Sequence, residues 1–272
     1  MRKIQWSIAL ALIGCLCLLA PTSALAEDEA YPEARYTVIH FDQVEPSSAP
    51  AYEENSAAWA AAFKEAGLGE EYAWRMYQGP NFGYAFLSDL PNFAALDKSE
   101  EQQKEVAEAL GAEKMAELVA GVAASSHYSE VTKDVPELTY VPEGGVGDYG
   151  IVHLTTHHVK PGMNEQFKAL AMKVIDAHKK VGSKMPVFGS EIQFGRGSFQ
   201  FATLAKDTAS FYAAPQTGAV LAEAYGPEVA QDLFNQWRDC ITAYETSDWQ
   251  FRPDLSYMPG AMEEEEMKGS AE

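Results

Sequence analysis

The chain has 272 residues, of which 47% are hydrophobic and 22% charged, a composition typical of globular proteins. Its 40 acidic and 20 basic side chains give a net charge of −20. That balance excludes a nucleic-acid binder, which must neutralise phosphates with Lys and Arg, and it disfavours docking on an anionic membrane. The chain has only three cysteines, so a disulfide-based scaffold is excluded as well.

The first 26 residues resemble a bacterial secretory signal. Arg2 and Lys3 precede an apolar run, and an Ala-Leu-Ala triplet ending at Ala26 supplies the small residues of a cleavage site. We therefore expect cleavage after Ala26, a periplasmic or secreted protein, and no stable membrane insertion afterwards. Two alternatives are an uncleaved anchor, for which the run is short of the ~20 residues that a membrane span needs, and lipoprotein processing at Cys15.

The rest of the chain contains an internal repeat. Three motifs recur in the same order at offsets of 113, 115 and 117 residues. The matched pairs are Tyr36–His40 with Tyr149–His153, Ala107–Glu113 with Ala222–Glu228, and Pro136–Pro142 with Pro253–Pro259. The small drift in the offset indicates short insertions in loops, where they are tolerated.

The repeat predicts two homologous units, residues 34–142 and 148–259. Residues 143–147 contain three glycines and form the expected linker. Four consecutive glutamates near the end of the chain indicate an acidic, disordered tail over residues 260–272.

Both units have the same predicted order of elements. Each has a strand, a helix, a hairpin of two strands, a second helical region interrupted by glycine, and a last strand. In the first unit these are 36–44, 52–66, 72–78 with 83–88, the region broken near Gly111, and 127–132. In the second they are 149–157, 167–181, 186–194 with 199–204, the region broken near Gly226, and 245–251.

The order β-α-β-β-α-β is that of a ferredoxin-like unit, an antiparallel sheet with helices on one face only. The other face must be covered, and two copies in one chain can cover each other. We therefore expect an α+β protein in which two tandem ferredoxin-like units pack sheet to sheet as an intramolecular pseudo-dimeric α/β barrel. Such a chain needs no second copy and is expected to be a monomer.

The segment Val159–Phe167 carries a Pro161-Gly162 pair just before the first predicted helix of the second unit. It resembles the segment that precedes the first helix in members of the dimeric α/β-barrel superfamily, namely NIPSNAP-like and antibiotic-biosynthesis-monooxygenase-like (ABM-like) domains. The first copy, Glu45–Pro50, keeps a proline but departs from that pattern. The resemblance implies a fold shared by cofactor-free monooxygenases, haem-degrading oxygenases, isomerases and ligand sensors. The fold alone therefore does not select the function.

His40 and His153 are equivalent in the two repeats and are the candidate catalytic residues. If their strand face is the bare one, both enter the barrel and can relay a proton, bind a metal or hold a polar group of a ligand. The alternative is that each histidine only bonds a neighbouring polar side chain. No metal site is predicted, because His153 and His157 lie about 13 Å apart along a strand at roughly 3.3 Å per residue.

Aromatic side chains supply the candidate ligand-binding residues. Tyr84 and Phe86 alternate on one strand, and Phe199 and Phe201 are their counterparts. If one face of these strands lines the barrel, it can hold a flat organic molecule, and most other aromatic residues form the core. The complete set is Tyr84, Phe86, Phe199, Phe201, Trp74 and His178. His178 is included because it aligns with the apolar Phe63.

These observations favour an exported small-molecule-binding protein with an aromatic or apolar ligand held between the two sheets. One alternative is a monooxygenase-like or haem-handling oxidoreductase in which His40 or His153 assists the chemistry. Another is a structural or assembly protein without a ligand. No cofactor is required, and haem is a further possibility. Because the second unit carries more histidines, we expect any polar pocket to belong mainly to it. Cys240 lies on an apolar helix stripe and is expected to be a buried, inert thiol.

Overall fold

The computed structural model describes residues 35–121 and 123–259. The expected signal peptide (1–26) and acidic tail (260–272) lie outside the described residues. Within these ranges, no helix combines the length and the apolar character that crossing a membrane would require.

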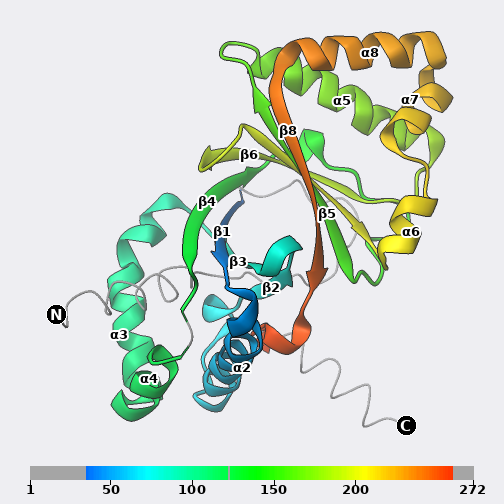
Figure 1. Ribbon diagram of the computed structural model, residues 1–272. Helices are drawn as coiled ribbons and strands as arrows, with labels where there is room; N and C mark the ends of the chain where they lie inside the picture. Colours follow the sequence, from blue (N-terminus) through cyan, green and yellow to red (C-terminus); the bar gives the residue numbers. More distant parts are fainter. Residues whose placement is uncertain (1–34, 122, 260–272) are drawn as a thin grey trace. The chain divides into compact units, whose positions relative to one another are not determined.

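The first repeat contains the predicted elements in the predicted order (Figure 1). They are β1 (Tyr36–Gln43), α2 (Ala49–Glu65), β2 (Arg75–Gln78), β3 (Gly83–Leu90), α3 (Ser99–Leu110), α4 (Ala112–Val119) and β4 (Ser126–Asp134). Strand β2 begins later than expected, because a 3-10 turn at Glu70–Tyr72 precedes it.

The second repeat follows the same plan, with one short extra helix, α6, that the sequence pattern did not indicate. Its elements are β5 (Ile151–Val159), α5 (Asn164–Val181), β6 (Val187–Phe194), β7 (Phe199–Ala205), α6 (Thr208–Ala213), α7 (Thr217–Tyr225), α8 (Pro227–Cys240) and β8 (Ile241–Phe251). Cys240, at the end of α8, is fully buried as expected, and burial raises the pKa of its thiol.

Glycine interrupts the second helical region of both repeats, as predicted. Gly111 separates α3 from α4 with φ of 78°, and Gly226 separates α7 from α8 with φ of 88°. A residue with a side chain rarely adopts these angles. The two glycines therefore fix the bend between the paired helices.

The strands form a closed barrel in the order β1-β3-β2-β8-β5-β7-β6-β4. Within the repeats the hairpin and neighbouring strands pair antiparallel, for example β1 with β3 and β5 with β7. The predicted α+β class, with tandem ferredoxin-like units forming one barrel, is confirmed.

The compact units of the fold do not coincide with the two sequence repeats. Of the described residues, unit 1 comprises 35–129 and 252–259, and unit 2 comprises 130–251. The last segment of the second repeat therefore belongs to unit 1, and the last segment of the first repeat belongs to unit 2. Strand β4 is shared between the units.

These two segments are attached by equivalent contacts. In unit 1, Trp74 and Tyr257 exchange backbone hydrogen bonds of 2.8 and 3.0 Å. In unit 2, Tyr140 and Val187 do the same at 2.7 and 2.8 Å. Each unit thus contains one copy of the repeated Pro-x-Leu-x-Tyr motif, which we call its strap. The strap pairs with the backbone at the start of the hairpin of that unit, at Trp74 in unit 1 and at Val187 in unit 2.

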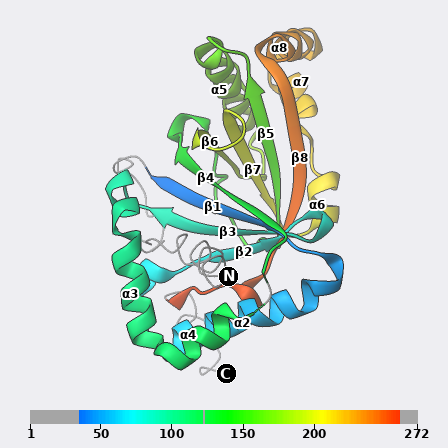
Figure 2. The ribbon, with the colours of Figure 1, turned by 60° about the vertical axis from the view of Figure 1, so that its left-hand side comes forward.

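The core of unit 1 lies between its sheet and α2. Tyr52, Trp59 and Phe63 lie at spacings of seven and four residues on one face of α2, as an amphipathic helix requires. They pack against buried side chains from β2, β3, α4 and the strap: Met76, Tyr84, Phe86, Leu118, Leu255 and Tyr257. Figure 2 shows α2 and α4 along the same face of β1, β3 and β2.

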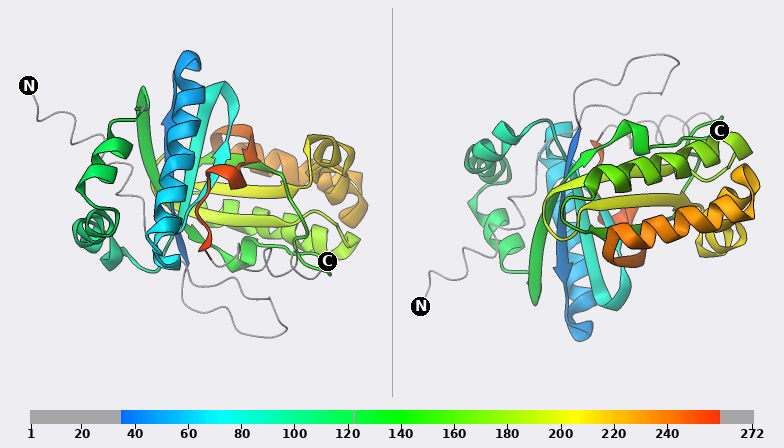
Figure 3. Two further views of the ribbon diagram at one scale, coloured as in Figure 1. Left: turned by 90° about the horizontal axis from the view of Figure 1, so that it is seen from below. Right: turned by 90° about the horizontal axis from the view of Figure 1, so that it is seen from above.

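Unit 2 has its own core between its sheet and α5 and α8. Phe167 and Ala171 of α5 pack with Phe199, Cys240 and the strap residue Leu138. Figure 3 (right) shows α5 and α8 side by side over the strands of this unit. In each unit, therefore, helices cover one face of the sheet.

We expect each strap to contribute directly to the stability of the unit that it joins. Leu138 and Leu255 are 0% and 2% exposed, so Leu138→Ala and Leu255→Ala should each lower the free energy of unfolding by about 2–5 kcal/mol. Denaturant unfolding followed by circular dichroism measures the loss. Glu137→Ala, at an exposed strap position, is the matched control and should change little. An unchanged midpoint for Leu255→Ala would contradict the assignment of that strap to unit 1.

Candidate functional site

A buried polar cluster lies on β1 in unit 1. His40 and Asp42 are two residues apart, so their side chains lie on the same face of the strand, and they are only 3% and 4% exposed. The start of β4 runs beside the end of β1, where the backbone N–H and the hydroxyl of Ser125 both donate to the carbonyl oxygen of Gln43 at 2.8 Å. This contact brings His127 and Ser129 of β4 next to His40.

Hydrogen bonds connect four side chains of this cluster in a row. The hydroxyl of Tyr52 on α2 donates to Oδ2 of Asp42 at 2.5 Å. Oδ1 of Asp42 lies 3.1 Å from Nε2 of His40, and Nδ1 of His40 lies 2.8 Å from Oγ of Ser129. Because a carboxylate only accepts hydrogen bonds, Nε2 of His40 carries a proton and Nδ1 is the atom presented to Ser129.

Burial raises the pKa of Tyr52, and the adjacent Asp42 carboxylate raises it further. The tyrosine therefore stays protonated and remains a hydrogen-bond donor to Asp42. A carboxylate buried in this way is costly unless it is fully hydrogen-bonded, so Tyr52 and His40 together hold Asp42 in one position.

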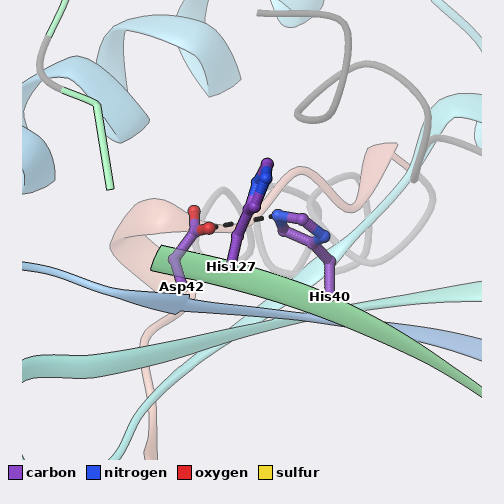
Figure 4. Close-up of side chains that lie close together, drawn as sticks. All are labelled: His40, Asp42 and His127. Carbon is purple, nitrogen blue, oxygen red and sulfur yellow. Dashed lines mark hydrogen bonds and ion pairs between the residues drawn. The ribbon is translucent and has the colours of Figure 1, made fainter. Parts of the chain in front are cut away.

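His127 completes the cluster from the exposed side. Its ring lies edge-on to His40, with the ring centroids 5.5 Å apart. One ligand atom from each of His40, Asp42 and His127 lies within 4.8 Å of the other two. Figure 4 shows the three side chains, from β1 and β4, projecting to the same side of the strands. These are the described residues best placed to hold a metal ion.

His40 lies on the helix-covered face of its sheet, not on the bare face that the sequence analysis considered. Asp42 shares that face and contacts Tyr52 of α2. In the strand register, Tyr84 pairs with Asp42 and Phe86 with His40. Tyr84 and Phe86, together with Trp74, belong to the core beneath α2. These three residues therefore do not form the expected lining, because the helix needs their apolar surface.

The aromatic residues expected to line unit 2 are also core residues. Phe199 stacks on Phe167 of α5, with ring centroids 5.0 Å apart, and Phe201 packs against the same cluster. His178 is 2% exposed and lies beside Tyr140, at 5.6 Å between ring centroids. Its Nδ1 atom is buried without a hydrogen-bond partner, and burial lowers its pKa.

His153 has different surroundings from its repeat equivalent, His40. Its Nδ1 atom lies 2.7 Å from Oδ1 of Asp248 on β8, and its ring stacks on Phe211 at 4.4 Å. Tyr212 donates to the other oxygen of Asp248 at 3.1 Å. His153 is thus paired and part-exposed. The larger polar cluster lies in unit 1, whereas the number of histidines in the second repeat predicted a polar pocket there.

The sequence pattern did not identify four residues of this cluster, Asp42, Tyr52, His127 and Ser129. The His40-x-Asp42 spacing was the available signal, because alternate residues of a strand share a face. His127 and Ser129 lie almost 90 residues later, and only the packing of β4 beside β1 brings them to His40. Tyr52 resembled an ordinary core residue of an amphipathic helix.

His157 is enclosed by aromatic rings in unit 2. The rings of Phe167, Phe201, Trp237 and Tyr244 have centroids 5.1–6.3 Å from its own. Its Nδ1 atom is buried without a hydrogen-bond partner. Burial disfavours the charged ring, and the nearby His158 acts in the same direction, so the pKa of His157 falls to about 4.

We expect His157 to make the protein less stable in mild acid. As the pH falls, the unfolded chain binds a proton at this histidine near pH 6.5, whereas the folded chain binds it only near pH 4. The stability that the neutral, buried ring provides is therefore fully present above pH 6.5. It should be lost between about pH 6.5 and 4, lowering the free energy of unfolding by about 2–3 kcal/mol. His157→Phe should flatten this part of the stability–pH curve in denaturant titrations. His158→Phe, at a partly exposed neighbour, should keep most of the wild-type slope, because burial is the larger cause of the low pKa of His157. An identical slope for both variants would refute the assignment.

Comparison with known proteins identifies the fold through solved structures. No protein-family model matches the sequence, and no curated protein matches it significantly. A proposed monooxygenase from Fusobacterium nucleatum subsp. nucleatum superimposes with a TM-score of 0.53 at 11% identity, covering 81% of this chain and 94% of the other. A second proposed monooxygenase, from Lactobacillus acidophilus, gives 0.51 at 8% identity, covering 83% and 97%.

A chlorite dismutase from Candidatus Nitrospira defluvii matches with a TM-score of 0.48 at 10% identity, covering 81% of this chain and 92% of that one. At such low identities, these similarities concern the fold and not the activity. The barrel order of the strands, the duplicated ferredoxin-like plan and the two matches above 0.5 agree with one another. This chain has the dimeric α/β-barrel fold, built as a tandem duplication.

Proposed function

We propose that this chain is an exported small-molecule-binding protein whose ligand contacts the His40 cluster of unit 1. The observation that supports the proposal is the buried row of hydrogen bonds from Tyr52 through Asp42 and His40 to Ser129. Its far end, at Ser129 and His127, is exposed. A row of hydrogen-bonded side chains that is ordered in the interior and ends at the surface is well placed to bind a polar group of a ligand.

The surroundings of His40 favour a ligand that is also partly apolar. The exposed ring of His127 lies 5.5 Å from that of His40 between centroids and offers a flat molecule a surface to pack on. A flat molecule with one hydroxyl or carbonyl group could place its polar atom at Ser129 or His127. The ligand class predicted from the sequence is therefore retained, but we place the ligand at the His40 cluster instead of between the two sheets.

A second candidate function is a cofactor-free, monooxygenase-like oxidoreductase. The proton on Nε2 of His40 faces Asp42, so the Nδ1 lone pair accepts from the hydroxyl of Ser129. In this state His40 can take up a proton from a phenol or enol, with Asp42 stabilising the charged ring. An anion formed in this way is more easily oxidised than its neutral parent. The two structural matches to proposed monooxygenases agree with this alternative, but at such low identity they are not evidence for the activity.

The residues of unit 2 do not fit haem. A haem needs a histidine nitrogen beside an open apolar slot that accepts the flat macrocycle. His157 and His178, whose Nδ1 atoms lack partners, are packed against aromatic rings at 5.1–6.3 Å and 5.6 Å. His153 is stacked on Phe211 at 4.4 Å. An aromatic side chain thus lies against each of these three rings, where the macrocycle would have to be placed.

Ligand titration of the intrinsic tryptophan fluorescence tests the binding proposal. We expect at least one flat aromatic hydroxyl or carbonyl compound to give a saturable change. His40→Gln should weaken its binding about tenfold or more, because it removes the imidazole that links Ser129 to the Asp42 carboxylate, and hydrogen bonds to charged groups contribute about 1.5–3 kcal/mol. His153→Gln is the matched control and should retain wild-type affinity.

Thermal unfolding would confirm that both variants remain folded. Equal losses from the two substitutions, or a loss at His153 alone, would contradict a site at His40. If no compound in the set changes the fluorescence, the result would instead favour the third possibility, a structural or assembly protein without a ligand.

Export is part of the proposal and is tested separately. When the full chain is expressed in a bacterial host, we expect a periplasmic, monomeric product whose intact mass begins at Glu27, because cleavage after Ala26 removes the signal. A product that keeps Met1 would contradict cleavage, and lipid on Cys15 would indicate lipoprotein processing.

A further inference from the structure

We infer that His40, Asp42 and His127 bind a divalent transition-metal ion of the zinc type in unit 1. The inference uses the same cluster as the proposed function but does not depend on a small-molecule ligand. One ligand atom from each residue lies within 4.8 Å of the other two. Two of the side chains are buried and one is exposed, so an ion can enter from the His127 side (Figure 4).

Two of the three ligand atoms lie close to the separation that a zinc ion requires. Nε2 of His40 and Oδ1 of Asp42 are 3.1 Å apart. Zinc bonds to nitrogen and oxygen of about 2.0–2.2 Å place neighbouring ligand atoms of a tetrahedral site roughly 3.3–3.5 Å apart. The His40–Asp42 pair needs only a small opening to admit an ion. His127 is exposed, so its ring can turn to supply the third bond.

The other polar atoms of both buried ligands are held by outer partners. Nδ1 of His40 lies 2.8 Å from Oγ of Ser129, and Oδ2 of Asp42 accepts from Tyr52 at 2.5 Å. When an ion displaces the proton from Nε2, the remaining ring proton lies on Nδ1 and donates to Oγ of Ser129. Metal-binding histidines characteristically donate their second N–H in this way, which fixes the tautomer and orients the ring. The same arrangement orients Asp42, so Nε2 and Oδ1 remain as the two atoms directed at an ion.

The donor set determines the class of ion. Two imidazoles and one carboxylate suit zinc, cobalt, nickel or iron(II), whereas calcium and magnesium prefer sites made entirely of oxygen. Three protein ligands leave a fourth position open for water or another small ligand, as in catalytic rather than structural zinc sites. The net charge of −20 on the chain also favours the approach of cations.

The absence of a predicted metal site in the sequence has a simple origin. His153 and His157, which the sequence pattern suggested as a pair of ligands, are on one strand of unit 2 and too far apart for one ion. The proposed ligands come from two strands, and His127 lies 85 residues after Asp42 in the chain.

Calorimetric titration of untagged, chelator-treated protein with zinc tests the site, and the visible absorption of bound cobalt reports its geometry. We expect one equivalent to bind with a dissociation constant of about 1 µM or lower, and the cobalt spectrum to indicate four or five ligands. His127→Ala should weaken binding at least tenfold, because it removes an exposed ligand without disturbing the buried pair. His158→Ala, at a partly exposed histidine bonded to Glu245 in unit 2, should bind as the wild type does.

Absence of saturable binding by the wild type would overturn the inference, as would equal affinity in His127→Ala and the control. Asp42→Asn should also lose binding, and the His127 variant keeps the test valid if that protein fails to fold. The aromatic titration uses metal-free protein, so the two proposals fail independently.

Discussion

The buried carboxylate of Asp42 is the constraint around which the polar part of unit 1 is arranged. A carboxylate that is 4% exposed must be hydrogen-bonded, because its desolvation is otherwise too costly. Tyr52 meets this need from α2 and His40 meets it from the same strand. Their bonds tie the helix to the sheet and turn Nδ1 of His40 towards Ser129. Both the ligand proposal and the metal proposal use the geometry fixed in this way.

The duplication preserved the backbone plan but not this polar arrangement. His153 occupies the position of His40, yet Thr155 stands where the first repeat has Asp42, at the strand offset of 113. At the helix offset of 115, Phe167 replaces Tyr52. The space beneath α5 is consequently filled by rings that enclose His157, and His153 takes its carboxylate from Asp248 on β8 instead. Because a core requires only matched apolar surfaces, the two units can share a backbone plan although only unit 1 contains the polar row.

The straps explain why the sequence repeats and the compact units differ. Each Pro-x-Leu-x-Tyr motif ends its own repeat in sequence but contributes its leucine to the core of the other unit. Leu138 and Leu255 are both almost completely buried there. A repeat is defined by ancestry along the chain, whereas a unit is defined by which apolar surfaces pack together.

The sequence by itself determined the order and approximate limits of the elements. Helical spacing of apolar residues, alternation in strands and glycine at the bends are local properties, and they were sufficient for the β-α-β-β-α-β plan and its duplication. Only the tertiary structure decided which sheet face His40 occupies, because a shift of one residue would reverse it. It also decided that Tyr84 and Phe199 serve helix packing, and that β4 carries His127 to His40. Contacts between distant segments depend on the packing of whole elements, which no local pattern encodes.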